Sequence, residues 1–229
     1  YIMIPIRDEL PTRKFPIITV VLIFTNILIF LFEILQGPRL ELFFRQVGLV
    51  PAFLWGEKEI TTSLISPWLT LFSSMFFHGN ILHLGSNMLY LWIFGNNVED
   101  FLGHFHYLLF YLISGMFAGL VHALIFPSST IPTIGASGAI AGVMGGYLVL
   151  FPGARVVVML IFGFFVTFVK VKAILVLGGW ILLQVISGLT TLGMSSRGGV
   201  AWFAHIGGFL LGALWCKITS NRYYKTHYW

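Results

Sequence analysis

One serine and one histidine stand out because each lies in an apolar stretch among small residues. Ser137 belongs to a Gly-Ala-Ser-Gly stretch at 135–138, and His205 to an Ala-His-Ile-Gly-Gly stretch at 204–208. A serine hydroxyl becomes a nucleophile when a neighbouring base, usually histidine, accepts its proton. The pair therefore predicts a catalytic dyad, with Ser137 as nucleophile and His205 as general base. In the alternative, Ser137 only caps the following helix, since serine is a favoured N-cap residue, and His205 is a packing residue.

A second polar pair, His83 and Asn87, lies four residues apart and so shares one face of a helix. Both side chains can donate hydrogen bonds, and together with the Ser137 amide they would complete an oxyanion hole. Alternatively they form a polar clasp between helices. His78, five residues before His83, is either a further donor or an interfacial residue.

The positions of the acidic residues limit the kind of site. Asp100 is the last acidic residue in the chain, so a carboxylate is not expected to complete a triad around His205, and a Ser-His dyad is predicted. No H-E-x-x-H motif is present, which argues against a zinc protease. A single cysteine, Cys216, excludes an internal disulfide, and we expect it to be structural. The remaining histidines are expected in loops, in packing or in the tail: His104, His106, His122 and His227.

The composition indicates which elements hold these groups. Of 229 residues, 58% are hydrophobic and only 9% are charged, against about 25% charged residues in ordinary globular proteins. This excludes a disordered, nucleic-acid-binding or conventional cytosolic protein. We expect one all-α polytopic membrane domain over residues 1–229, with a core at about 16–216 and roughly six spans. The expected spans are 16–35, 81–94, 107–126, 138–151, 173–189 and 200–216.

The fourth span is expected to be short. Its roughly 14 residues extend only about 21 Å, less than the roughly 30 Å of a hydrocarbon core, so one end must lie below the membrane surface. Small residues four apart, Gly138 and Gly142 on this span and Gly208 and Gly212 on the last, allow two helices to approach closely. That approach would bring His205 within reach of Ser137.

The connections and the basic residues predict the orientation. Residues 38–68 are expected to form a long loop at the membrane interface, and 155–169 an interfacial or half-buried loop, since a seventh span there would put the termini on opposite sides. With both termini inside, the basic residues divide nine to four, which satisfies the positive-inside rule. The inside set is Arg7, Arg13, Lys14, Arg155, Lys170, Lys172, Lys217, Arg222 and Lys225, and the outside set is Arg39, Arg45, Lys58 and Arg197. The first apolar run is also too long for a cleavable signal peptide.

The joint pattern of His83-x-x-x-Asn87, the stretch at 135–138 and Ala-His-x-x-Gly-x-x-x-Gly at 204–212 resembles the rhomboid family of intramembrane serine proteases over about residues 60–215. The resemblance implies a six-helix bundle, a Ser137-His205 dyad with His83 and Asn87 as oxyanion donors, and a lateral gate formed by the fifth span together with the loop that follows it. It also implies transmembrane protein substrates cut near the outer membrane face. A prokaryotic cytoplasmic membrane protein is expected, with no cofactor, metal or nucleic acid and no required oligomer.

Two positions depart from the family pattern. Well-known bacterial members carry a Trp-Arg pair in the first loop, which this chain lacks. Some members place an aromatic residue four positions after the nucleophile, beneath the base, where this chain has Ala141; the orientation of the His205 ring is thus left open.

A channel that relays protons or ammonium is disfavoured because the polar set is confined to the outer half. A catalytically inactive relative is disfavoured because Ser137 and His205 are both present.

Overall fold

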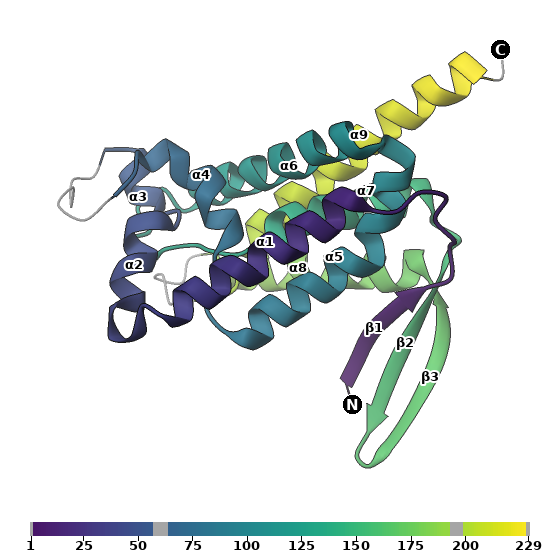
Figure 1. Ribbon diagram of the computed structural model, residues 1–229, viewed down its shortest axis with the longest axis horizontal. Coiled ribbons are helices and arrows are strands. Elements are labelled where there is room, and N and C mark those ends of the chain that lie inside the picture. Colours follow the sequence, from purple (N-terminus) through teal and green to yellow (C-terminus); the bar gives the residue numbers. More distant parts are fainter. Residues whose placement is uncertain (1, 57–63, 193–198, 228–229) are drawn as a thin grey trace.

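The computed structural model describes residues 2–56, 64–192 and 199–227, with side chains from Met3 to Asn221. The described chain is mostly helical, with a small sheet at one end of the helices (Figure 1). The long helices are α1 (Ile17–Ile34), α5 (Ile81–Leu102), α6 (His104–Ile125), α7 (Ser137–Leu150), α8 (Ala173–Thr191) and α9 (Trp202–His227). Three of them, α1, α6 and α8, are long and apolar enough to cross a membrane.

Helix α7 is the centre of the bundle. Every residue from Gly138 to Tyr147 is buried, because α5, α6, α8 and α9 all pack against this helix. Its small and apolar side chains permit burial on all sides. The helix has 14 residues, which agrees with the short fourth span expected from the sequence.

Two helices are longer than expected. The structure continues α5 to Leu102, beyond the predicted end near 94, because Gly95 is packed tightly against α6 and α1 rather than ending the helix. Gly103, with φ +76°, ends it instead. Helix α9 continues past Lys217 to His227; the predicted end near 216 marks only the end of its apolar part.

The expectation of an all-α chain is wrong for residues 155–172. Strands β2 (Arg155–Phe162) and β3 (Phe165–Lys172) form an antiparallel hairpin, and β1 (Ile2–Asp8) pairs antiparallel with β2. The segment expected to be an interfacial or half-buried loop at 155–169 is therefore part of a three-stranded sheet. Its runs of Val, Ile and Phe have the β-branched and aromatic composition of strands, but its second partner, β1, lies more than 140 residues earlier in the chain.

Two carboxylates, Glu99 and Asp8, hold the N-terminal segment on the bundle. Glu99, only 1% exposed, accepts hydrogen bonds from the backbone amides of Ile18 and Thr19 at 2.8 Å and from the Thr19 hydroxyl at 2.7 Å. It therefore caps the start of α1, where amide groups lack partners within the helix. Asp8 accepts from the Tyr147 hydroxyl at 2.6 Å and from the Asn97 amide, which attaches β1 to α7 and α5.

The described parts of the long first loop are short helices: η1 (Gly37–Arg39), α2 (Leu40–Val47), α3 (Pro51–Leu54), η2 (Pro67–Leu69), α4 (Thr70–Ser73) and η3 (Ser74–Phe76). This region is attached to α6 and to the chain preceding α7. The Trp55 indole donates to the Ala123 carbonyl at 3.2 Å, and Leu49 forms an isolated antiparallel bridge with Thr133. The loop thus supports the segment that leads into Ser137.

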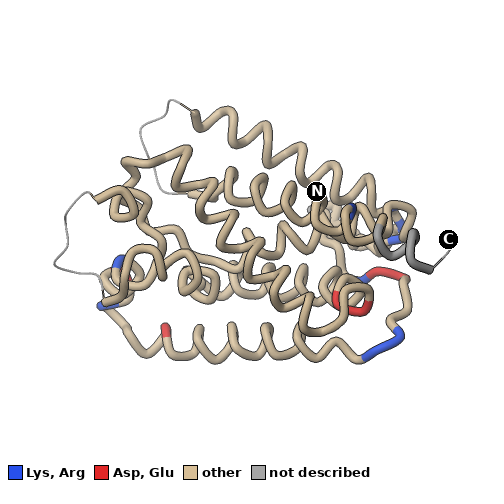
Figure 2. Tube along the Cα trace, turned by 90° about the horizontal axis from the view of Figure 1, so that it is seen from above, with Lys and Arg blue, Asp and Glu red and all other residues tan. Residues whose placement is uncertain are grey.

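Charged residues gather at the two ends of the bundle, and the middle is almost free of them (Figure 2). Strand β1 and the last turns of α9 lie at the same end (Figure 1). The basic residues assigned to the inside lie at this end as far as the structure describes them. Of those assigned to the outside, Arg39 and Arg45 lie at the opposite end, whereas Lys58 and Arg197 fall outside the described residues.

Candidate active site

Ser137 is the first residue of α7, and the backbone before it follows a sharp turn. Gly135 has φ +129°, a conformation that L-residues with a side chain rarely adopt, and its amide donates to the Ser74 carbonyl at 2.9 Å. Ala136 occupies the N-cap position, and no side chain caps the helix. The alternative in which Ser137 serves as the N-cap is therefore wrong, and its hydroxyl is free for another partner.

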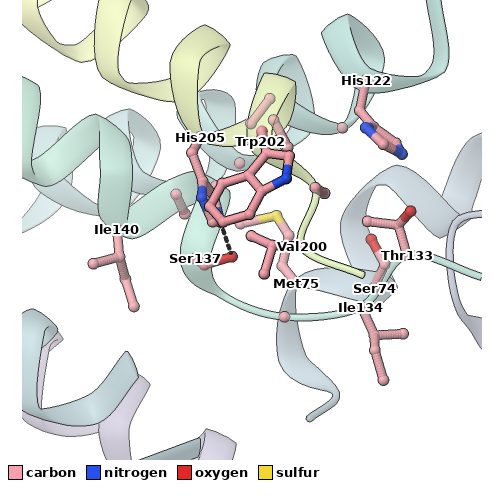
Figure 3. A pocket seen from close by; sticks show the side chains of 18 of the residues that line it. Ser74, Met75, His122, Thr133, Ile134, Ser137, Ile140, Val200, Trp202 and His205 are labelled. Atoms are coloured by element: carbon pink, nitrogen blue, oxygen red, sulfur yellow. Dashed lines mark hydrogen bonds between the residues drawn. The ribbon is translucent and has the colours of Figure 1, made fainter. Parts of the chain in front are cut away.

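That partner is His205 in the first turn of α9. The distance from its Nε2 to the Ser137 Oγ is 2.8 Å, a normal hydrogen bond. Figure 3 shows His205 reaching from α9 to Ser137 at the start of α7. The serine hydroxyl donates to Nε2 when the proton of the neutral ring is on Nδ1, which is the arrangement that a nucleophile and its base require.

Close contact between α7 and α9 makes this distance possible. A Cβ atom added to Gly208 would overlap the carbonyl oxygen of Gly138, and one added to Gly212 would overlap that of Gly142. The four glycines singled out in the sequence therefore lie at the crossing of the two helices, with backbone against backbone.

Two residues of α8 contact the other side of the His205 ring. The Gln184 Oε1 lies 2.7 Å from Nδ1 and accepts a hydrogen bond from the N–H there. The Trp180 ring lies beside the imidazole, with centroids 5.6 Å apart and planes inclined by 34°. Neither residue was predicted from the sequence, because the third member of a serine protease triad is ordinarily a carboxylate. Gln184 could have been singled out from the sequence, because a polar side chain within an apolar span is costly in a membrane and usually has a functional role.

His83 and Asn87 lie on α5 and line the same cavity as Ser137. The His83 ring packs so closely on Gly135 that a Cβ there would lie 2.8 Å from its Nε2. Asn87 is 6% exposed, and among the described residues its amide nitrogen has no hydrogen-bond partner. A buried donor without a partner is costly in a folded protein, so this group is suited to bind an oxygen that enters the cavity.

His78 does not line the cavity. Its backbone amide donates to the Glu33 carboxylate at 3.0 Å, and its ring meets that of His83 edge to face with centroids 5.1 Å apart. The structure thus puts His78 behind His83, in contact with a proposed oxyanion donor but away from Ser137.

The cavity has a volume of about 930 Å³ and a mostly apolar lining. Met75, Val200 and Trp202 are among the lining residues (Figure 3). His122, expected to be a packing residue, also lines it. Cys216 is buried against Gly146, in keeping with a structural role. The described residues include no group of three or more His, Cys, Asp or Glu that could hold a metal ion.

Comparisons with known proteins place the chain in a family. The family model for the rhomboid domain matches residues 66–222. Rhomboid protein 1, mitochondrial, of Saccharomyces cerevisiae is 33% identical over 165 residues, which cover 69% of this chain and 43% of that protein. Rhomboid protease AarA of Providencia stuartii is 31% identical over 139 residues, 55% of this chain and 48% of that protein.

A third relative, rhomboid protease GluP of Bacillus subtilis, is 37% identical over 94 residues, 41% of this chain and 18% of that protein. The chain thus spans less than half the length of these relatives. They include bacterial and mitochondrial proteins, so the comparisons support the family but not the expectation that the protein is prokaryotic. The match over residues 66–222, which contain Ser137, His205, His83 and Asn87, establishes that the chain belongs to the rhomboid family.

Proposed function

We propose that this chain is an intramembrane serine endopeptidase that cleaves transmembrane protein substrates near the outer membrane face. The observation that carries the proposal is the 2.8 Å hydrogen bond between the Ser137 hydroxyl and His205 Nε2, beside a cavity lined by Asn87 and His83. The relatives named as rhomboid proteases support the same activity.

In the proposed reaction, the Ser137 Oγ attacks the carbonyl carbon of the scissile peptide bond while His205 Nε2 takes the hydroxyl proton. Negative charge develops on the carbonyl oxygen, where Asn87, His83 and the Ser137 amide would donate hydrogen bonds. His205 then gives its proton to the leaving amine as the carbon-nitrogen bond breaks. A water molecule, deprotonated by His205, hydrolyses the resulting ester and restores Ser137.

The proposed membrane arrangement has six spans, α1 and α5 to α9, with both termini in the cytoplasm. It is supported by the position of β1 and the end of α9 at one end of the bundle, where most described basic residues gather. The start of the short α7 would then lie below the outer surface, at the floor of the cavity that admits water. A reporter fused after residue 229 tests this arrangement, because an outside location would contradict it.

The test of the activity is cleavage of a transmembrane reporter protein by the purified chain in liposomes. Ser137→Ala and His205→Ala are each expected to abolish cleavage, while Ser187→Ala on α8 and His106→Ala at the far end of the bundle are matched controls that retain it. Asn87→Ala is expected to reduce kcat by about 10²- to 10³-fold. Cleavage that persists in Ser137→Ala would refute the proposed nucleophile.

A further inference from the structure

We propose that Gln184 and Trp180 of α8 are positioning residues that hold the His205 ring in the orientation and tautomer its role as a base requires. The inference rests on the proposed function and adds to it the group that takes the place of a triad carboxylate. It is carried by the contacts of the two side chains with the imidazole.

The hydrogen bonds of Gln184 determine which way its amide points. The side chain is 6% exposed, and its Nε2 donates to the Trp180 carbonyl of the preceding turn at 3.4 Å. The opposite amide orientation would turn the carbonyl oxygen of Gln184 toward that of Trp180, and two acceptors repel each other. Oε1 therefore faces His205 at 2.7 Å.

This orientation selects one tautomer of His205. A carbonyl oxygen can only accept a hydrogen bond, so Nδ1 must carry the ring proton and Nε2 must present its lone pair to Ser137. An aspartate has the same orienting role in serine proteases with a triad, where it also stabilises the imidazolium that forms. Gln184 fixes the tautomer with a neutral group and so brings no charge into the apolar bundle.

Trp180 provides the second constraint on the ring. Its indole lies next to the imidazole, with centroids 5.6 Å apart and planes inclined by 34°, and Trp202 meets the same ring edge to face at 6.4 Å. An aromatic face also attracts the positive charge that His205 acquires during the reaction. Some members of the family carry an aromatic residue four positions after the nucleophile, where this chain has Ala141 on α7; here Trp180 of α8 is an aromatic neighbour of the base instead.

The experiment compares an isosteric variant that lacks the acceptor with one that keeps it. Gln184→Met retains the length and volume of the side chain without a strong acceptor, and Gln184→Glu retains an oxygen at the same reach. Leu183→Met, an exposed position beside it on α8, is the matched control. For each protein, kcat and KM are measured separately on the transmembrane reporter, together with the rate at which a fluorophosphonate modifies Ser137.

Gln184→Met is expected to lower kcat by about 10- to 100-fold with KM nearly unchanged, because a buried hydrogen bond that orients the base is lost. The rate of phosphonate modification should fall in parallel, and Gln184→Glu should recover most of both rates. Wild-type kcat in Gln184→Met would overturn the proposal. So would an equal loss in Gln184→Met and Gln184→Glu, since that result would indicate packing alone.

Trp180 gives a test that does not depend on the folding of the Gln184 variants. Trp180→Phe keeps an aromatic ring and is expected to stay within about threefold of wild-type kcat, whereas Trp180→Leu should lose about tenfold or more. Equal rates in the two would contradict the stacking role. If Ser137→Ala abolishes cleavage and the α8 variants leave it unchanged, this inference fails and the proposed function stands.

Discussion

Replacing Gly142 by alanine tests whether the close approach of α7 to its neighbours sustains the fold and the site. The added Cβ would lie 2.6 Å from the Ser114 Cβ on α6 and 3.3 Å from the Gly208 carbonyl on α9. The first distance is about 0.8 Å short of the 3.4 Å at which ordinary van der Waals contact begins, so α6 and α7 must separate. Overpacking of this kind costs about 1–3 kcal/mol, against a gain of about 1 kcal/mol from the better helix propensity of alanine.

The expected net result is a loss of up to about 2 kcal/mol, and a loss of that full size would lower Tm by roughly 4–8 °C for a chain of this size. Thermal unfolding in detergent micelles measures the effect. Cleavage should fall as well, because a shift of α7 against α9 lengthens the hydrogen bond between Ser137 and His205.

The matched control is Gly179→Ala on α8, where an added Cβ meets no atom within 4 Å. The same substitution there creates no overlap, so only the better helix propensity of alanine acts, and it is expected to raise stability by about 0.5–1 kcal/mol. A Tm for Gly142→Ala equal to or above that of Gly179→Ala would refute the argument that the contacts of α7 leave no space for a methyl group.

Three further outcomes are expected. Glu99→Ala should cost about 3 kcal/mol or more in unfolding experiments, because the buried amides and hydroxyl at the start of α1 lose their acceptor. Gly135→Ala should reduce cleavage sharply, because an alanine backbone is strained at φ +129° and the new Cβ would displace the His83 ring. Cleavage equal to wild type would contradict this. Burial raises the pKa of Asp8 above its usual value, with the Tyr147 hydrogen bond opposing. Folding therefore favours its protonated form, and the wild type should lose stability relative to Asp8→Asn as the pH rises from 4 toward 7, as Tm measured across that range would show.

The candidate dyad was predictable because polar side chains are costly within a membrane and are therefore rare in apolar spans. Ser137 and His205 each interrupt an apolar stretch, and glycines four apart on both spans indicated a close helix crossing. The sheet was not predictable in the same way. The strands at 155–172 are apolar enough to resemble a membrane-associated segment, and their pairing with residues 2–8 depends on contacts remote in sequence.

Gln184 shows where reasoning from residue types alone fell short. The absence of any acidic residue after Asp100 correctly excluded a carboxylate near His205 from the later helices, but it did not exclude a neutral acceptor. Gln184 lies 21 positions before His205, and only the packing of α8 against α9 reveals that the two side chains meet.

The composition and the spacing of small and polar residues were sufficient to predict a helical membrane protein with a serine and a histidine at one site. These properties are local, because hydrophobicity, helix periodicity and glycine spacing act along a single segment. Three features required the tertiary structure: the partners of His205 on its other side, the capping of α1 by Glu99, and the sheet at one end of the bundle. Each depends on the distance between segments that the chain brings together only when its helices pack.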